Sequence, residues 1–284
     1  MPRKFLITGG GGQLAGAFKK ILTQQNGLFL APSHKDLDIT DPKSLESHIL
    51  KFRPDVVLNC AAYNHVDLAE AEERDKAFSV NATAVKNLAE ICCTKNIFLV
   101  HYSSDAVFDG RKADLYVEED PTHPVSEYGK SKLAGEQYLV SSKAKSLLFR
   151  VSWVYGEGER NFLAKLKTLI DEGKPLRMTC DRFSVPTSAR DIAQITLKAI
   201  DAGLTGLYHL VNSGFASRYE FTRAFIKAKG IERAVFPMLA SNYPEKAKRP
   251  FFGAMSNRKI SEALHISILH WQDSLEQFVK SSRV

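Results

Sequence analysis

The sequence predicts an α/β fold in which helices cover both faces of a doubly wound parallel sheet. Strand-like and helix-like runs alternate through the first half of the 284-residue chain. The run Lys4-Phe5-Leu6-Ile7-Thr8 leads straight into four glycines, and a helical pattern follows them. The run at 56–60 is almost wholly apolar, which is typical of a parallel strand buried on both faces.

The individual elements are predicted in chain order from their apolar periodicity. After the glycines, Leu14, Phe18, Ile21 and Leu22 form one apolar helical stripe. A helix starts at Asp41-Pro42, with proline at its first position. We expect further strands at 28–31, 56–60, 97–102, 147–152 and 206–211, and further helices at 75–95, 161–170, 190–202 and around Tyr128.

Composition and charge favour a globular protein with small anionic ligands. The chain is 44% hydrophobic and 25% charged, and no apolar run approaches the ~20 residues of a membrane span. Its first residues lead directly into a strand, without room for a signal peptide, so we expect a soluble cytoplasmic protein with no membrane partner. The net charge of +7 is scattered among 32 acids, which argues against a nucleic-acid partner.

The cysteines show no spacing that binds metal. Cys60 closes a predicted strand and the Cys92-Cys93 pair lies in an apolar helix, so buried free thiols are expected. Neither a metal site nor a disulfide is predicted.

The glycine run is interpreted as a dinucleotide-binding turn of the Rossmann type. Gly9 and Gly12 allow a tight turn, and Gln13 and Leu14 open a helix whose free N–H groups suit a pyrophosphate. The spacing Gly-x-x-Gly-x-x-Ala ends in Ala15 where glycine is usual. The alternative is a flexible glycine loop, which the flanking strand and helix disfavour.

The residues after the second strand bear on the choice of nicotinamide cofactor. An NAD site usually places an acid there, on the ribose 2′-hydroxyl. This chain has Ser33, His34 and Lys35, with Asp36 and Asp38 further along. Because a hydroxyl and a cation suit a 2′-phosphate, the sequence favours NADPH over NADH.

The element pattern becomes less regular beyond Gly156. We expect residues 1–156 to form the dinucleotide-binding domain, with 186–212 returning to it. Residues 157–185 and 213–284 are expected to form a smaller, discontinuous C-terminal substrate lobe, because their C-terminal part combines helices and loops with aromatics and arginines.

Tyr128 and Lys132 are the predicted acid–base pair. Four residues apart on a helix, their side chains share one face. An ammonium beside a phenol stabilises the phenolate, so Lys132 is expected to lower the pKa of Tyr128 from about 10. Ser104 ends the preceding strand and adds a hydroxyl. The alternative is an exposed helix surface, which the strand and the glycine turn disfavour.

Seven segments carry a family resemblance: Gly12-Gln13-Leu14, Asp38–Asp41, Asn59–Asp67, Ser103–Gly110, Tyr128–Glu136, Arg150–Gly156 and Arg249-Pro250. On these segments the chain resembles the extended short-chain dehydrogenase/reductases and, within them, the dTDP-4-dehydrorhamnose reductase family. The resemblance runs over nearly the whole chain, and its motifs are specific when taken together.

That resemblance implies a reaction, the transfer of hydride from NADPH or NADH to the 4-keto group of a dTDP-4-keto-6-deoxyhexose. It implies that Tyr128 protonates the alkoxide, Lys132 holds the nicotinamide ribose and Ser104 bonds the carbonyl oxygen. Asn81 resembles the proton-relay asparagine of the family, although a helical asparagine is more often merely exposed.

The resemblance also implies binding residues. Asp105 and Trp153 would contact the sugar, and Arg249 would grip the diphosphate with its guanidinium. A core position is the alternative for Trp153. Beside the glycine turn and Ser33–Lys35, the cofactor would be lined by Asp38, Ile39, Ala61, Ala62 and Tyr63.

Five positions depart from the family pattern. Ala106 stands where the reductases usually carry tyrosine beside the substrate. The resulting Ser-x-Ala-Val pattern resembles that of sugar-nucleotide 4-epimerases instead. Arg182 and Ser184 replace an expected glutamine and glycine, and Gly253 replaces a serine. These substitutions bear on the sugar more than on the chemistry. Ala17 stands where some relatives supply a glutamate to a metal-bridged dimer, so that dimer is not predicted, although a homodimer of another kind stays open.

Two other classes of protein stay open. A sugar-nucleotide 4-epimerase or 4,6-dehydratase would share Tyr128 and Lys132 but retain NAD, and a dehydratase needs an acid pair where this chain has Asp105-Ala106. A non-catalytic regulatory subunit, like the partner of methionine adenosyltransferase, would not need Ser104, Tyr128 and Lys132 together. Oxidation of NADPH in the presence of a dTDP-4-keto sugar would separate the three.

Overall fold

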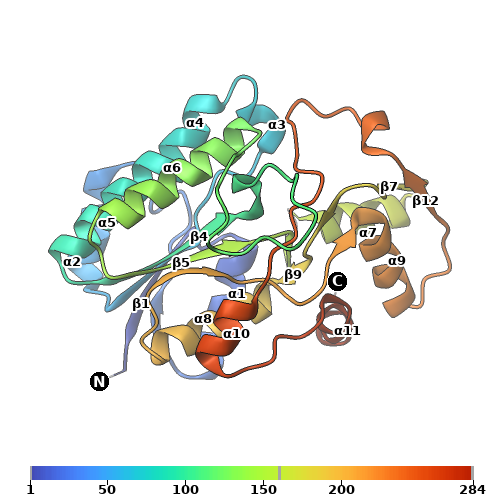
Figure 1. Cartoon of the computed structure of the whole chain (residues 1–284). Helices are drawn as coiled ribbons and strands as arrows, with labels where there is room; N and C mark the ends of the chain where they lie inside the picture. Colours follow the sequence, from blue (N-terminus) through green and yellow to red (C-terminus); the bar gives the residue numbers. More distant parts are fainter. Residues whose placement is uncertain (1, 159–160, 283–284) are drawn as a thin grey trace.

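Six parallel strands form the central sheet of the computed structural model, which describes residues 2–158 and 161–282. Their order across the sheet is β10-β5-β4-β3-β1-β2 (Figure 1). The chain leaves β1 on one side towards β2 and returns on the other side with β3, so the topological switch point lies between β1 and β3. The predicted doubly wound fold is confirmed. The strands are β1 (Lys4–Thr8), β2 (Leu28–Leu30), β3 (Val56–Asn59), β4 (Phe98–Ser104), β5 (Ser146–Val151) and β10 (Gly206–His209).

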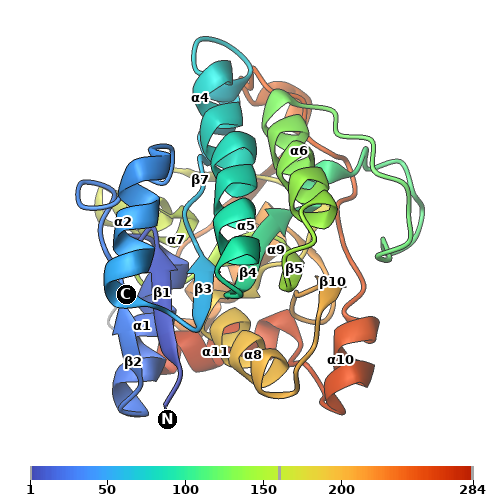
Figure 2. The same cartoon turned by 90° about the vertical axis from the view of Figure 1, so that its left-hand side faces the viewer.

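Helices cover both faces of this sheet (Figures 1 and 2). Phe18, Ile192 and Ile260 belong to the buried cluster on one face, under α1 (Gln13–Gln24), α8 (Ala189–Asp201) and α10 (Arg258–Leu264). Leu45 and Leu139 belong to the cluster on the other face, under α2 (Pro42–Phe52), α5 (Ala84–Thr94) and α6 (Glu127–Ser141). Each side chain of this kind contributes roughly 1.5–3 kcal/mol by leaving water.

The helix predicted at 75–95 contains a wide turn in its middle. α4 (Arg74–Phe78) passes into the π-helical turn η1 (Ser79–Thr83) and then into α5. A π turn inserts an extra residue, so it changes which side chains face the sheet. Asn81 is consequently buried, whereas the sequence pattern left it open to solvent.

Boundaries of the other elements differ from the predicted ones by one or two residues. β4 runs two residues further than predicted, to Ser104, while β10 stops two residues earlier, at His209. Asp41 caps α2 by accepting a hydrogen bond from the Lys43 N–H at 3.0 Å, so the helix itself begins at Pro42.

A smaller unit is formed by segments that precede and follow β10 in the chain. Its buried cluster includes Leu166, Phe221, Trp271 and Phe278, and it contains α7 (Phe162–Asp171), α9 (Arg218–Ala228) and α11 (Trp271–Ser281). Three two-stranded ladders accompany these helices, formed by β6 (Val154–Tyr155) with β9 (Thr187–Ser188), β7 (Leu176–Thr179) with β12 (Val235–Met238), and β8 (Phe183–Ser184) with β11 (Ala216–Ser217).

The segment between β12 and α10 connects this unit back to the sheet. After η3 (Ala240–Asn242) it passes α3 (Val66–Ala69), where the N–H groups of Lys246 and Ala247 donate to Asp67 Oδ1 at 3.1 and 3.0 Å. It then returns to α10 (Figure 1). None of the helices in the described ranges has the length and apolarity needed to span a membrane.

Candidate active site

The glycine turn joins β1 to α1 at the switch point. Gly12 N–H donates to the Gly9 carbonyl at 2.8 Å, and Gly10 N–H donates to the Pro32 carbonyl at 2.9 Å. A Cβ at Gly10 would lie 2.2 Å from the Ala31 carbonyl oxygen, so only glycine allows this approach. The turn therefore brings the loop that follows β2 beside the N-terminus of α1.

The N-terminus of α1 fits the pyrophosphate of a dinucleotide. Its N-cap residue, Gly12, offers no side-chain hydrogen bond, and its first turn contains no acid. The uncapped N–H groups are available to an anion, which the helix dipole also favours. Five other helices in the described ranges, α2, α6, α7, α9 and α11, are capped by the side chains of Asp41, Ser126, Asn161, Ser217 and His270.

Gln13 and Leu14, the first residues of α1, offer different groups to a ligand. Gln13 Nε2 donates to the Val154 carbonyl at 2.9 Å, whereas its buried Oε1 has no hydrogen-bond partner among the described residues. Leu14 packs against the core beneath the sheet, so only its backbone faces the turn.

In the loop after β2, the Asp36 carboxylate lies beside Ser33 and reduces the positive charge that His34 and Lys35 led us to expect. His34 and Lys35 are exposed, but Ser33 Oγ donates to Asp36 Oδ2 at 2.6 Å. This hydrogen bond lowers the pKa of Asp36 and keeps it ionised. A 2′-phosphate at Ser33 would therefore meet a carboxylate as well as the Lys35 ammonium. Further along, Asp38 Oδ1 accepts from Thr40, and Ile39 lies in the core.

The segment after β3 lies beside the glycine turn. Thr8 Oγ1 donates to Asn59 Oδ1 at 2.6 Å and accepts from the Ala61 N–H at 3.2 Å. Ala62 follows, and the Tyr63 hydroxyl donates to a glutamate, Glu73, at 2.6 Å. The implied cofactor-lining role of residues 61–63 stays a prediction.

Asn81 ties this segment to α6. Its Oδ1 accepts from the Tyr63 N–H at 2.9 Å, and its Nδ2 donates to the Tyr63 carbonyl at 3.1 Å and to Ser131 Oγ at 3.0 Å. The side chain thus holds the backbone at Tyr63. A proton relay through Asn81 stays a prediction.

Tyr128 lies in the first turn of α6 and donates from its hydroxyl to Asn64 Oδ1 at 3.3 Å. Burial raises the pKa of Tyr128 to about 12; the Asp105 charge adds to this, and the Ser104 hydroxyl opposes it. The expectation that Lys132 lowers this pKa is wrong. The phenol therefore keeps its proton at neutral pH, as a proton donor must.

The Lys132 ammonium is directed to the sheet. It donates to the Tyr102 carbonyl of β4 at 2.6 Å, in a buried position. Burial lowers the pKa of Lys132 to about 8, and Glu136 partly offsets this effect. The spacing of four residues puts Tyr128 and Lys132 on one face of α6. The Lys132 ammonium nevertheless donates to a backbone carbonyl, and no sequence pattern predicts such a contact.

Two glycines and an ion pair fix α6 against its neighbours. A Cβ at Gly129 would lie 2.2 Å from the Ala106 carbonyl oxygen, and one at Gly135 would lie 2.1 Å from a carbonyl oxygen of the π turn. Glu136 Oε2 pairs with Arg150 Nη2 at 2.8 Å, and both side chains are 5% exposed. Removing one partner would leave an uncompensated buried charge.

Three serine hydroxyls surround the Asp105 carboxylate at the end of β4. Ser104 Oγ donates to Oδ1 at 2.9 Å, and Ser152 and Ser184 donate to Oδ2 at 2.8 and 2.6 Å. Burial raises the pKa of Asp105, and the three hydroxyls oppose that rise. Asp105 and Ser104 are among the residues predicted from the sequence, Ser152 is not, and Ser184 was noted only as a departure from the family pattern.

Arg218 is a charged neighbour of this cluster that was not predicted from the sequence. Its Cζ lies 3.8 Å from the centre of the Trp153 ring and 4.4 Å from that of Phe162. Burial lowers the pKa of Arg218 to about 10, and the nearby Asp105 charge opposes the shift. Trp153 has a φ of +36°, which an aromatic residue rarely adopts. The sequence signal that could have placed Arg218 at a helix start is the capping box formed by Ser217 and Glu220 at the beginning of α9.

Arg249 is held by carboxylates. Its Nη2 pairs with Asp67 Oδ2 at 2.8 Å and its Nη1 with Glu245 Oε1 at 3.0 Å. Arg182 pairs with the same Glu245. The two arginines therefore share one acid, so a diphosphate could compete for either guanidinium.

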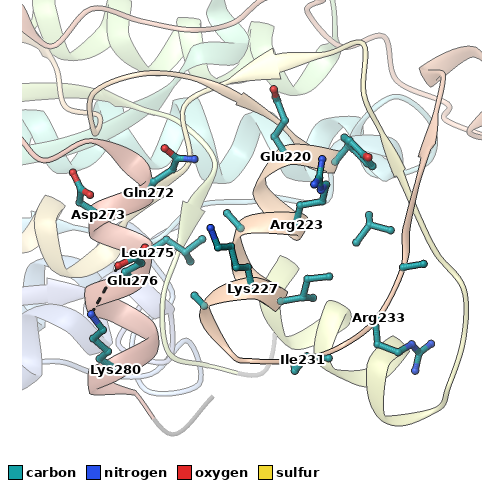
Figure 3. A pocket seen from close by; sticks show the side chains of 16 residues that line it. Glu220, Arg223, Lys227, Ile231, Arg233, Gln272, Asp273, Leu275, Glu276 and Lys280 are labelled. Carbon is teal, nitrogen blue, oxygen red and sulfur yellow. Dashed lines mark ion pairs between the residues drawn. The ribbon is translucent and has the colours of Figure 1, made fainter.

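One hollow lies apart from this constellation, and a second reaches it at Gln13. A groove of about 1190 Å³ lies on the smaller unit between α9 and α11, lined by charged side chains that include Arg223, Lys227 and Glu276 (Figure 3). It contains none of the residues selected from the sequence. A second hollow, of about 350 Å³, is lined by Gln13 and by Ala17, which supplies no carboxylate for a metal bridge. No cluster of three metal-ligating side chains was found in the described ranges.

Comparisons with known proteins found relatives that match nearly the whole chain. The spore coat polysaccharide biosynthesis protein SpsK of Bacillus subtilis (strain 168) is 34% identical over 98% of this chain and 97% of its own length. The dTDP-4-dehydrorhamnose reductase of Aggregatibacter actinomycetemcomitans is 36% identical over 96% and 97%. A Bacillus anthracis dTDP-4-dehydrorhamnose reductase, solved in complex with NADP, superimposes with a TM-score of 0.95 at 29% identity, covering 99% and 100%. The model of the RmlD substrate binding domain matches residues 3–284, and the chain belongs to that family.

Proposed function

We propose that this protein transfers hydride from NADPH to the 4-keto group of a dTDP-4-keto-6-deoxyhexose, as a dTDP-4-dehydrorhamnose reductase does. One observation supports this most. The uncapped N-terminus of α1 and the group of Ser104, Tyr128 and Lys132 occur at the same carboxyl edge of the parallel sheet. Ligands of open α/β sheets bind at this edge.

NADPH supplies the hydride when it is bound. Tyr128 then gives its proton to the alkoxide oxygen, a general-acid role that contributes roughly 10²–10⁴ in rate. Its pKa of about 12 keeps that proton available at neutral pH. Ser104 turns its hydroxyl from Asp105 to the carbonyl oxygen and stabilises the developing charge. Lys132, positively charged below pH 8, holds the ribose hydroxyls.

The binding residues are proposed as the sequence predicted them. The residues that would hold the cofactor are Ser33–Lys35, Asp38, Ile39, Gly9–Leu14 and residues 61–63, and Asn81 fixes that last segment. Asp105 and Trp153 take the sugar. Arg249 takes the diphosphate, which replaces one of its carboxylate partners.

We propose that cofactor binding and substrate binding belong to separate parts of the chain, with the boundaries predicted from the sequence. Residues 1–156 and 186–212 bind the cofactor, which is supported by the pairing of β10 with β5 in the central sheet. Residues 157–185 and 213–284 bind the substrate, although α10 packs beneath the sheet. We propose the cytoplasm as the site of this NADPH-dependent reaction, and a homodimer, if formed, that needs no metal ion.

The test is oxidation of NADPH by the purified protein when a dTDP-4-keto-6-deoxyhexose is supplied. We expect consumption of one NADPH for each 4-hydroxy product. Interconversion of dTDP-sugars without net consumption of NADPH would instead indicate an epimerase. Binding of NADPH without turnover of any keto sugar would favour a regulatory subunit.

A further inference from the structure

Four phenylalanines form an exposed aromatic patch beside the Asp105 cluster, here called the phenylalanine platform: Phe183, Phe215, Phe251 and Phe252. Their rings meet edge to face, with centroids 6.1 Å apart for Phe183 and Phe215, 6.3 Å for Phe183 and Phe251, and 5.2 Å for Phe215 and Phe252. Phe215 and Phe251 are 48% and 60% exposed. Exposed aromatic area of this kind is unfavourable in water and marks binding surfaces.

The platform is continuous with the proposed sugar site. Phe183 N–H donates to the Phe251 carbonyl at 2.9 Å, and Gly253 N–H donates to the Phe183 carbonyl at 2.8 Å. The residue after Phe183 is Ser184, whose hydroxyl donates to Asp105 at 2.6 Å. Segment 182–184 thus carries a platform residue and a hydrogen bond to Asp105. Segment 249–253 carries two platform residues and accepts a hydrogen bond from Ser184 at the Gly253 carbonyl.

The same two segments carry the cations of this region. Arg182 precedes Phe183, and Arg249 lies two residues before Phe251. A nucleotide sugar has three parts to be recognised: a sugar, an anionic diphosphate and a flat base. The region offers a group for each part. The hydroxyls and carboxylate at Asp105 suit the sugar, the two guanidiniums suit the diphosphate, and the exposed aromatic surface suits the base.

We propose that the phenylalanine platform binds the pyrimidine base of the nucleotide-sugar substrate by stacking. This inference rests on the proposed function and adds to it the place where the base is held. Stacking on one aromatic ring contributes about 1–3 kcal/mol per base, which corresponds to roughly 5- to 150-fold in affinity.

The experiment titrates NADPH-saturated protein with dTDP and, separately, with inorganic pyrophosphate. Phe251→Ala and Phe215→Ala are each expected to weaken dTDP binding by about 5- to 150-fold and to leave pyrophosphate binding unchanged. Phe251→Tyr keeps the ring and should keep the affinity. Phe236→Ala is the matched control, because Phe236 is 53% exposed but lies on β12, outside the platform.

The outcomes separate this inference from the proposed function. Failure of the native protein to bind dTDP would overturn both. Normal dTDP affinity in Phe251→Ala and Phe215→Ala, beside tight binding by the native protein, would overturn the platform alone. A change in sedimentation with unchanged dTDP affinity would make the platform a contact between protein copies and would overturn its role in base binding.

Discussion

Ser184 and Gly253 face each other across one oxygen of the Asp105 carboxylate. Ser184 Oγ donates to Asp105 Oδ2 at 2.6 Å, and a Cβ at Gly253 would lie 3.1 Å from the same oxygen and 3.5 Å from Ser184 Oγ. The family resemblance led us to expect glycine at 184 and serine at 253. Relative to that pattern, the hydroxyl stands at 184 and not at 253, and both positions of this chain lie beside the same carboxylate.

This relationship predicts a compensated pair of substitutions. Ser184→Gly should lower kcat/KM for the keto sugar roughly 10- to 100-fold, because a hydrogen bond to a charged group contributes about 1.5–3 kcal/mol. Ser184→Gly with Gly253→Ser should recover most of that loss, since the serine returns a hydroxyl to Asp105. Steady-state kinetics of the double-mutant cycle, with NADPH affinity as the control, measures the coupling. Additive losses would show that the two positions are independent.

Replacement of Tyr128 by phenylalanine tests the proton donor. Tyr128→Phe deletes only the hydroxyl, so turnover should fall about 10²-fold or more while NADPH binding survives. Tyr138→Phe is the matched control, because Tyr138 lies on the same helix and is 42% exposed. Near-normal turnover in Tyr128→Phe would remove Tyr128 from the mechanism.

Lys132 predicts a pH dependence. Its pKa of about 8 means that the ammonium is present below pH 8 and is lost above it, so kcat/KM should fall as the pH rises through 8. Lys132→Arg, which stays charged, should move that decline to higher pH even if its rate is lower. A native profile that stays flat to pH 10 would contradict the role of the charge.

The same shift predicts how stability varies with pH. The unfolded lysine titrates near 10.4, so between pH 8 and that value the unfolded state binds more protons than the folded one. The contribution of Lys132 to the free energy of unfolding therefore increases with pH over this range. Chemical denaturation of the native protein and of Lys132→Met at several pH values, compared as a difference, isolates this contribution.

Sequence patterns predicted the sheet and its helices, because apolar periodicity reports burial directly. They failed where a backbone group or a change of helix type decides the contact. The Tyr102 carbonyl that takes the Lys132 ammonium has no sequence signature, and the π turn that buries Asn81 interrupts the periodicity itself.

Contacts between distant segments were likewise beyond prediction from the sequence. Ser152, in the loop after β5, and Ser184, on β8, meet Asp105 from separate segments, and Arg218 reaches Trp153 from the start of α9. Resemblance supplied single residues of this group, such as Asp105, but not the contacts among them. Their convergence follows from tertiary packing.

The loop after β2 predicts how cofactor preference can be changed. Lys35→Ala should weaken NADPH binding relative to NADH, because it removes a cation from the expected 2′-phosphate position. Asp36→Asn should do the opposite, since it removes the carboxylate that now accepts from Ser33. Binding titrations of both cofactors to both variants check this pair. If the ratio of NADPH affinity to NADH affinity were the same in the native protein and both variants, the 2′-phosphate of NADPH would not lie at this loop.

Ala106 predicts the breadth of sugar selection. Its N–H donates to Ser104 Oγ at 3.1 Å, and its carbonyl lies against Gly129, so the backbone here is fixed and a larger side chain must project from a set position. Alanine leaves open space at the position where the reductases carry tyrosine, and it offers no hydroxyl. A site that lacks a polar contact to the sugar discriminates less between related sugars. The native protein should therefore accept several dTDP-4-keto-6-deoxyhexoses, and Ala106→Tyr should raise the kcat/KM ratio in favour of the lyxo-4-keto sugar. A native protein already confined to that epimer, with a ratio that Ala106→Tyr leaves unchanged, would make position 106 neutral.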